Sequence, residues 1–282
     1  MNDIFYFLKE SQIANYADDN TTYLSKFGIF PLLHTLKSET EIVLNWFKIN
    51  EMKSNSEKCH LILAENEHRP SYISNSYIYL DKERELLASE TCVKLLGLWI
   101  DNKMTFEEHI KKLITKGNQK LHALMRIAKY MTIEKLRVLM KSFIESQFKY
   151  CPLVWMFHSK KIHNRINKLH ERALRVVYKN DDKLSFEELL KKDKSFSVHD
   201  RNLQKLAQVM YKVKEGLCPK PVQEIFTHID SNTNVRNNVN GGNWIIPKVR
   251  TERKGIETLR YRGPFTWNLI RTCSSQNGHD IF

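Results

Sequence analysis

Residues 13–24 read IANYADDNTTYL, and this stretch decides the fold class of the N-terminal region. Two adjacent carboxylates, Asp18 and Asp19, lie between short β-prone runs, which predicts a strand–turn–strand hairpin with an acidic tip. Adjacent aspartates repel each other, and a divalent cation at the tip would relieve this repulsion. Mg²⁺ prefers carboxylate oxygens together with phosphate oxygens, as in polymerases. A solvated β-turn is the simpler interpretation of the same pair.

The sequence after the hairpin mixes helical and β-prone patterns. Residues 34–48 predict a helix with an apolar side, residues 59–64 a strand, and residues 72–79 a β-prone run. The run 93–100 is almost continuously apolar, which predicts a single strand buried on both faces. Residues 101–103 are expected to turn the chain.

Helical patterns dominate from residue 105. Thr105 and Glu108 have the spacing of a capping box and predict the start of a helix. Thr132 is expected to cap a second helix, whose pattern ends at Pro152. The residues that this second helix is expected to turn inward are Leu136, Leu139, Met140, Phe143 and Ile144. A third helix is predicted over residues 160–178.

The C-terminal part continues the helical pattern and then loses it. Ser185 opens a second capping box, and a helix is predicted over 197–215 with Gly216 as its C-terminal stop. Residues 230–243 are rich in Asn and Gly and predict a loop. The last forty residues show no clear period. The fold class is therefore α+β, with a β-hairpin and a short sheet followed by helices.

Charge is distributed unevenly over the 282 residues, whose formal net charge is +13. Residues 1–100 carry a net charge of −4, residues 101–180 of +12, and residues 181–282 of +5. A concentrated positive field attracts polyanions. A solvated lysine-rich surface with no such partner would have the same composition.

Cysteine content and hydropathy argue against several classes of protein. The five cysteines include no Cys-x-x-Cys pair, which argues against zinc fingers and a disulfide scaffold. Cys151, His158 and His163 do not have the spacing of a zinc site, so a buried cysteine with surface histidines is expected. No apolar run reaches the roughly 20 residues that span a bilayer. We expect an intracellular protein of the nucleus or cytoplasm with no membrane partner.

Several motifs, taken in order, resemble one family. YADD at 16–19 resembles the active-site hairpin of reverse transcriptases, and the downstream segments are similar to those of non-LTR (LINE-type, jockey-like) retrotransposon polymerases. These segments are NWFKIN at 45–50, MKSN at 52–55, KC at 58–59, LIL at 61–63, VKLLGLWID at 93–101, FEEH at 106–109 and YRGPFTWN at 261–268. The resemblance implies a partial palm at 1–104, thumb-like helices at 105–180 and a mainly helical C-terminal region at 181–282.

The resemblance also implies roles for single residues. Asp18 and Asp19 would coordinate Mg²⁺, and Tyr16 and Ala17 would lie beneath the primer end. Lys58 would meet the departing pyrophosphate, with Lys53 as its rival; both are equally well read as solvated turn residues. Leu96 and Gly97 would lie at the primer grip, or would be ordinary strand core. The implied partners are an RNA template and a DNA primer, with no small-molecule cofactor other than the nucleotide.

One departure from the family decides the expected activity. The chain is expected to begin within the palm, without the fingers and without the upstream strand that carries the family's third metal-binding aspartate. We therefore expect a polymerase fragment that is inactive alone. One alternative is a non-catalytic basic module that binds nucleic acid, and another is an interaction protein with no nucleic-acid role. The basic positions on the third predicted helix are Lys161, Arg165, Lys168, Arg172 and Arg175.

Overall fold

The computed structural model describes residues 3–64, 77–79, 86–179, 184–228, 244–251 and 255–277. The chain forms two compact units, Met1–Glu108 and His109–Phe282. The first unit combines helices with small sheets, and the described elements of the second are almost entirely helical. This is the α+β class that the sequence predicts. None of the described helices is long and apolar enough to cross a bilayer.

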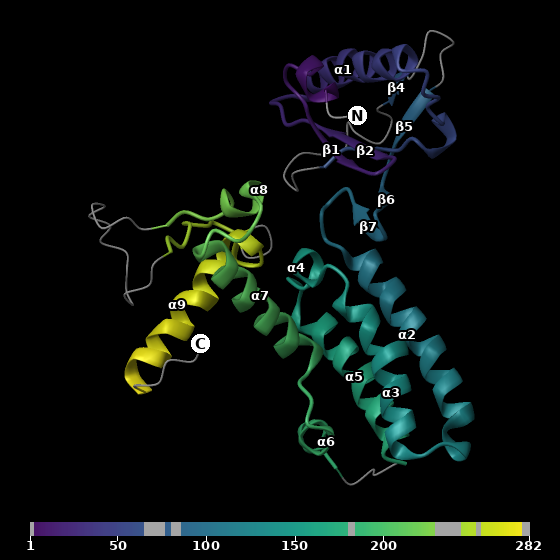
Figure 1. Cartoon of the computed structure of the whole chain (residues 1–282), viewed down its shortest axis with the longest axis vertical. Helices are drawn as coiled ribbons and strands as arrows, with labels where there is room; N and C mark the ends of the chain where they lie inside the picture. Colours follow the sequence, from purple (N-terminus) through teal and green to yellow (C-terminus); the bar gives the residue numbers. More distant parts are fainter. Residues whose placement is uncertain are drawn as a thin grey trace. The chain divides into compact units, whose positions relative to one another are not determined.

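The acidic motif forms the predicted hairpin. Strand β1 (Gln12–Tyr16) pairs antiparallel with β2 (Asp19–Tyr23), and Tyr16 lies opposite Asp19. Two residues therefore form the turn, and Ala17 has a φ of 54°. Helix α1 (Ile29–Ile49) contributes Val43 and Trp46 to a core shared with Ile13 of β1 and with Ile4 of the short 3-10 helix η1 (Ile4–Phe7) (Figure 1).

A buried carboxylate on α1 fixes the entry of the chain into β1. Glu39 is 4% exposed and accepts hydrogen bonds from the backbone N–H groups of Lys9, Glu10 and Ser11 at 2.8–2.9 Å. The Ser11 hydroxyl donates a further bond. Burial opposes the charged form, but these four donors outweigh it and hold the pKa of Glu39 below its usual value. Loss of the carboxylate would leave buried donors without an acceptor.

A three-stranded sheet packs against the N-terminal half of α1. Its order is β3 (Leu61–Ile62), β5 (Leu86–Glu90) and β4 (Tyr77–Tyr79), with β3 parallel and β4 antiparallel to β5. The strand predicted over 59–64 is thus only two residues long. Of the β-prone run 72–79, residues 77–79 form β4 and residues 72–76 lie outside the described residues.

The apolar run 93–100 folds differently from its prediction. It forms a second hairpin, in which β6 (Cys92–Leu95) pairs antiparallel with β7 (Leu98–Asp101). Leu96 and Gly97 form its two-residue turn with φ values of 46° and 86°, and Leu96 is 41% exposed. The prediction of one buried strand was wrong, and so was the alternative that Leu96 and Gly97 are ordinary strand core. Gly97 permits the positive φ that such a turn requires. Because the residues on both sides are apolar, the sequence pattern gave no sign of a turn.

Asp101 controls the passage from β7 into the first long helix, α2 (Glu107–Ile127). Its carboxylate accepts from the backbone N–H groups of Lys103, Thr105 and Phe106 and from the Thr105 hydroxyl. Phe106 has a φ of 56°, so the helix begins one residue later than a Thr105 cap implies. The Thr105 hydroxyl still accepts a bond from Glu107 N–H at 3.2 Å.

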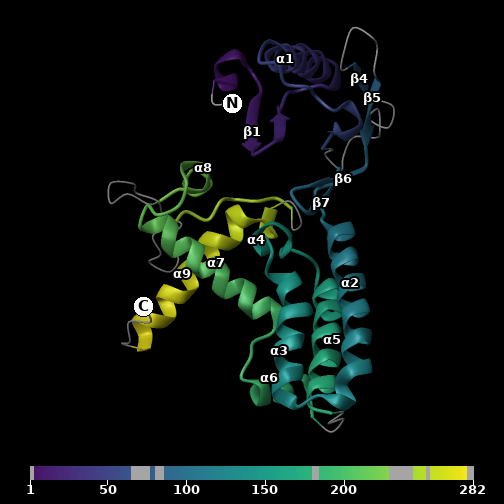
Figure 2. The same ribbon diagram turned by 45° about the vertical axis from the view of Figure 1, so that its right-hand side comes forward.

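Three helices form the bundle at the centre of the second unit. Helices α2, α3 (Ile133–Phe143) and α5 (Lys160–Val177) lie side by side (Figure 2). Thr132 caps α3 as predicted, through the N–H of Lys135. A Cβ at Gly117 of α2 would lie 2.5 Å from Leu169 of α5, so glycine permits their close approach. Buried residues from the three helices are Leu121, Leu124, Leu136, Met140, Ile166, Leu169, Ala173 and Val177.

The end of α3 departs from its prediction. The helix ends at Phe143, which is 46% exposed rather than turned inward. A 3-10 segment, η4 (Glu145–Lys149), and a short helix, α4 (Pro152–Trp155), follow it. Ile144, the residue after the last turn of α3, is buried as predicted. Phe143 instead faces away from the core.

The remaining helices carry clear terminal signals. The Ser185 capping box opens α6 (Phe186–Asp193), and Ser197 caps α7 (Val198–Lys214). Gly216, with a φ of 68°, ends α7 as predicted. The N–H of Gly216 donates to Val213 and that of Leu217 to Lys212, which is the Schellman arrangement.

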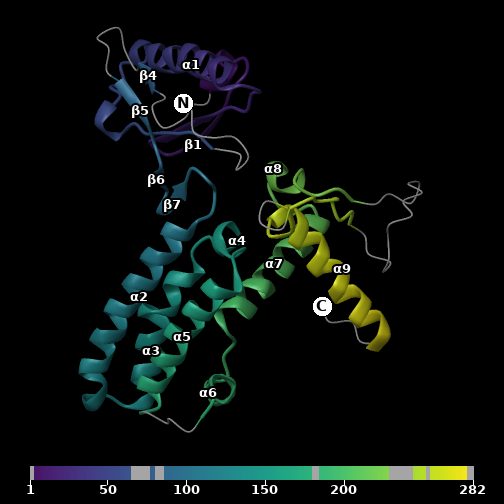
Figure 3. The same cartoon turned by 180° about the vertical axis from the view of Figure 1, so that it is seen from behind.

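The last long helix was not predicted. Helix α9 (Leu259–Asn277) lies beside α7, and α8 (Lys220–Gln223) lies between them in sequence (Figure 3). Gly263 and Pro264, both poor helix formers, stand inside α9, so no helical period is visible there. The buried residues of this region are Met210, Val213, Phe226, Trp244 and Trp267. The loop predicted over 230–243 lies outside the described residues.

We expect Glu39→Ala to lower the free energy of unfolding by about 2–4 kcal/mol, because it strands buried backbone donors. Glu41, exposed on the same helix, is the matched control, and Glu41→Ala is expected to change stability by no more than about 0.5 kcal/mol. Urea denaturation of the two variants measures the difference. Equal effects of the two substitutions would contradict the role given to Glu39.

Candidate functional site

The tip of the β1–β2 hairpin presents two carboxylates to solvent. Asp18 is the second residue of the turn, and Asp19 is the first residue of β2. Both are exposed, and neither forms an ion pair with a described residue. Tyr16, opposite Asp19, is 67% exposed, and Ala17 is exposed beside it. The predicted hairpin, with Asp18 and Asp19 exposed at its tip, is confirmed.

The tip can offer a cation few ligands. Among the described residues, no group of three or more His, Cys, Asp or Glu side chains is arranged to hold a metal ion. Asp18 and Asp19 thus supply at most two carboxylates, whereas Mg²⁺ takes six ligands in near-ideal octahedral geometry. Water or phosphate oxygens would have to provide the others. A polymerase reaction needs two metal ions held about 3.5–4 Å apart.

The other residues that the resemblance implicates lie on separate elements. Lys58 is exposed at the end of the 3-10 segment η2 (Ser56–Lys58), which leads towards β3. Lys53 lies in the exposed stretch just before it. Leu96 and Gly97 form the tip of the β6–β7 hairpin, not of β1–β2. The candidate residues of the first unit therefore come from three elements: two hairpin tips and a loop.

Four basic residues follow one exposed face of α5. Lys161, Arg165, Lys168 and Arg172 are exposed at spacings of four, three and four residues. Over the eleven residue steps from Lys161 to Arg172 a helix rises about 16 Å. The buried stripe of Ile166, Leu169, Ala173 and Val177 faces the core, as predicted. We call Lys161, Arg165, Lys168 and Arg172 the basic face. Arg172 also donates to the Asn118 side chain of α2 at 3.1 Å.

Arg175 does not belong to this face. Its guanidinium is 2.7 Å from the Glu171 carboxylate and donates to the backbone oxygen of Leu184 at 3.0 Å. The side chain is 22% exposed. Its place in the sequence pattern suggested a phosphate contact, but internal partners occupy it. Arg175 instead ties the end of α5 to the segment before α6.

A buried charge cluster holds α5 in place. Glu145 of η4 and His170 of α5 are each 3% exposed, with His170 Nε2 3.2 Å from a Glu145 oxygen. Arg201 of α7 binds the other oxygen. Burial alone would raise the pKa of Glu145, but the contacts with His170 and Arg201 lower it to about 2. Three elements thus share one ionised carboxylate.

A second buried carboxylate anchors α6 to the bundle. Asp193 is fully buried and accepts from Arg137 Nε of α3 at 2.7 Å and from the Tyr178 hydroxyl at 2.9 Å. Burial and this hydrogen bond raise the pKa of Tyr178 to about 12. Sequence reasoning missed both carboxylates. Their only signal is an acidic residue at an inward position of a helical pattern.

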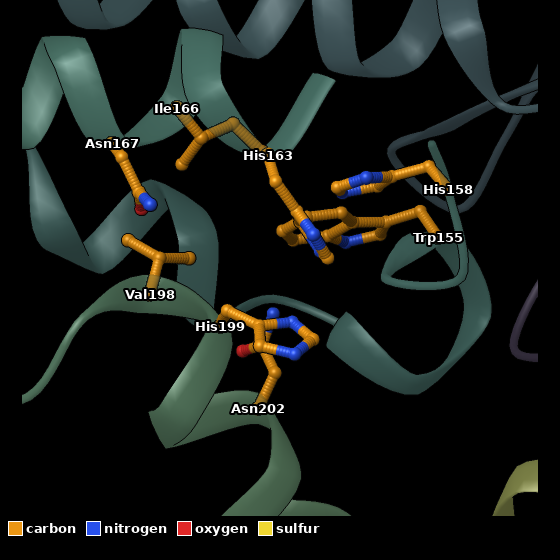
Figure 4. Close-up of a pocket in the computed structure, with 8 residues that line it drawn as sticks. All are labelled: Trp155, His158, His163, Ile166, Asn167, Val198, His199 and Asn202. Atoms are coloured by element: carbon orange, nitrogen blue, oxygen red, sulfur yellow. The ribbon is translucent and has the colours of Figure 1, made fainter. Parts of the chain in front are cut away.

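Aromatic and imidazole rings line a small pocket where α4, α5 and α7 meet (Figure 4). His158 is 9% exposed, whereas Cys151 is exposed, so the expectation of a buried cysteine with surface histidines was wrong. The third histidine, His199, comes from α7 and could not be placed there from sequence spacing. The residues that line the pocket are Trp155, His158, His163, Ile166, Asn167, Val198, His199 and Asn202.

We expect Glu145→Gln to lower the free energy of unfolding by about 2–3 kcal/mol at pH 7, because Arg201 loses its buried counter-charge. The native pKa of Glu145 lies below its unfolded value of 4.5, so its contribution is complete above pH 4.5 and is lost towards pH 2. As the pH falls from 4.5 towards 2, the free energy of unfolding should therefore decrease less in the variant than in the native protein. Denaturation measured from pH 7 to pH 2 tests this, with Glu224→Gln, an exposed site, as control. Parallel pH profiles for Glu145→Gln and the native protein would contradict the assignment.

Comparison of the chain with known protein families, with curated proteins and with solved structures gave no match. The functional argument therefore rests on the residues and on their placement.

Proposed function

We propose that the chain is part of an RNA-directed DNA polymerase of the non-LTR retrotransposon type, and that alone it does not extend a primer. One observation carries the proposal: Asp18 lies in the exposed two-residue turn and Asp19 directly follows it as the first residue of β2, on a hairpin whose Ile13 packs against α1. Exposed carboxylates at a hairpin tip are available to metal ions and phosphate oxygens. The order of the other motifs along the chain supports the same family.

The inactivity of the isolated chain follows from charge and geometry. Two Mg²⁺ ions carry four positive charges, and the hairpin supplies two negative ones from adjacent residues. No third carboxylate joins them in a metal-binding group within the described part of the chain. Metal ions held this weakly would lie out of register, and a misplacement near 1 Å already costs about 10²-fold in rate.

The second candidate function is non-catalytic binding of nucleic acid by the second unit. The observation that favours it is the basic face, whose four cations have no described acidic partner and follow one side of α5. Regularly spaced cations on a helix can contact successive phosphates without reading sequence. An RNA template and a DNA primer are the partners proposed, in the nucleus or cytoplasm.

We expect no primer extension when the purified chain is incubated with a primed RNA template, nucleotides and Mg²⁺. Gel analysis of the primer measures this, with an active reverse transcriptase as positive control and Asp18→Ala as the matched variant. Extension that Asp18→Ala abolishes would refute inactivity. It would show that a further carboxylate, Asp3 or another, completes the site.

We expect the chain to bind single-stranded RNA with affinity that falls about 50-fold between 50 and 200 mM salt, if four phosphates are neutralised. The double variant Arg165→Glu/Lys168→Glu should bind at least tenfold more weakly at 50 mM salt. Lys205→Glu/Lys212→Glu, with the same charge change on exposed positions of α7, should bind nearly as well as the native chain. Fluorescence anisotropy measures all three.

Two outcomes of this assay would count against binding through the basic face. Equal loss in both double variants would mean that net charge, not this face, attracts the RNA. No binding at 50 mM salt would favour an interaction protein whose basic residues are only solvated.

A further inference from the structure

Three imidazoles from three separate elements contact one another in the pocket. His158 follows α4, His163 lies in the first turn of α5, and His199 lies in the first turn of α7. The ring centroids of His158 and His163 are 4.4 Å apart, and those of His163 and His199 are 4.1 Å apart. Figure 4 shows His163 between the other two rings. We call these three residues the histidine cluster.

The surroundings of the cluster favour neutral rings. The Trp155 ring stacks on His158 with an angle of 8° between planes, and Ile166 and Val198 contribute apolar walls. The polar residues of the wall, Asn167 and Asn202, carry no charge. His199 Nδ1 is buried without a hydrogen-bond partner among the described residues. A proton added to His163 or His199 would therefore be poorly solvated, and for His158 burial outweighs the backbone oxygen of Ser159, 3.4 Å from Nδ1.

The charged and titratable groups around the cluster give little compensation. Asp200, next to His199 on α7, is the acidic neighbour, and its carboxylate already accepts the Ser197 hydroxyl at 2.7 Å. The positive charge of Arg262 on α9 lowers the pKa of His163 and of His199 further. From α2, His109 lies on Trp155 with ring centroids 6.1 Å apart. A protonated ring would face two other imidazoles and an arginine.

We propose that the histidine cluster is an acid-sensitive latch between α7 and the α2–α3–α5 bundle. While its rings are neutral, they pack together and hold the first turn of α7 against α5. Protonation places like charges about 4 Å apart, and the junction opens. Arg201, two residues beyond His199, keeps its bond to Glu145, so α7 stays tethered and the change is local.

The direction of the pH effect follows from linkage. Burial lowers the pKa of His158 and of His163 to about 4, and neighbouring histidines add to the effect. Burial also lowers the pKa of His199, against the opposing influence of Asp200. The unfolded chain, with an ordinary value of 6.5, binds more protons below that pH, so stability falls from pH 6.5 towards pH 4. By pH 5 the ratio of folded to unfolded protein falls on the order of tenfold for His158 and again for His163.

Hydrogen exchange of the native chain at pH 7.5 and pH 5.0, corrected for intrinsic rates, locates the opening. We expect peptides from α4, the first turn of α5, and α7 to lose at least tenfold in protection at pH 5.0, while α2 and α3 keep theirs. Unchanged protection at pH 5.0, or equal loss in every helix, would overturn the proposal. The effect of Glu145 lies below pH 4.5 and does not overlap.

A variant with one non-titrating ring tests the cause. His163→Phe keeps an aromatic ring in the cluster but cannot bind a proton, so the change in α7 protection between the two pH values should shrink by on the order of tenfold. His122→Gln, at an exposed position of α2, should retain the full change. An unaltered pH response in His163→Phe would refute the latch. If that variant does not fold, NMR titration of the native imidazoles decides: pKa values near 6.5 for all three would refute it, and values below 5.5 would support it.

Discussion

A carboxylate removed from water must be matched by donors, and this constraint organises both units. Glu39 collects three backbone N–H groups and a hydroxyl, and so fixes the segment before β1 to α1. Glu145 joins η4, α5 and α7 through His170 and Arg201. Asp193 ties α6 to α3 and to Tyr178. A buried pair of this kind adds little net stability over apolar packing, but the loss of one partner is costly, so each carboxylate specifies which elements meet.

The two candidate sites differ in how they are held. The acidic tip depends on a two-residue turn and on the packing of Ile13 against α1, both of which are local. The basic face depends on the long-range contacts of α5, because its charged side can stay in solvent only while Leu169 and Ala173 remain buried. One chain thus combines a site made by local geometry with a surface made by tertiary packing. In a polymerase the first would act on the nucleotide and the second on the phosphate backbone.

Local features were the ones that the sequence predicted well. The acidic hairpin, the Thr132 and Ser185 caps and the Gly216 stop each depend on a few neighbouring residues. The prediction of a single strand over 93–100 was wrong because one buried strand and a tight hairpin can have the same apolar composition. Only Gly97 distinguishes the two. Helix α9 was missed because Gly263 and Pro264 interrupt its pattern, and packing on Met210 and Phe226 overrides that cost. The histidine cluster depends on His199, which is distant in sequence from His163, so no local pattern reveals it. For Arg175 the sequence offers Glu171 one helical turn earlier, but not the backbone oxygen of Leu184 beyond the end of α5.

The two-residue turn at the acidic tip makes the length of the loop matter more than its composition. Tyr16 pairs with Asp19, and Ile13, opposite Thr22, faces the α1 core. A strand exposes alternate residues on opposite faces, so one extra residue between Tyr16 and Asp19 that left the turn at two residues would shift the register of β2 and reverse its two faces. Point substitutions at the tip would alter its charge and leave the frame intact. A single-codon insertion or deletion that kept a two-residue turn would instead move every side chain of β2 to the opposite face.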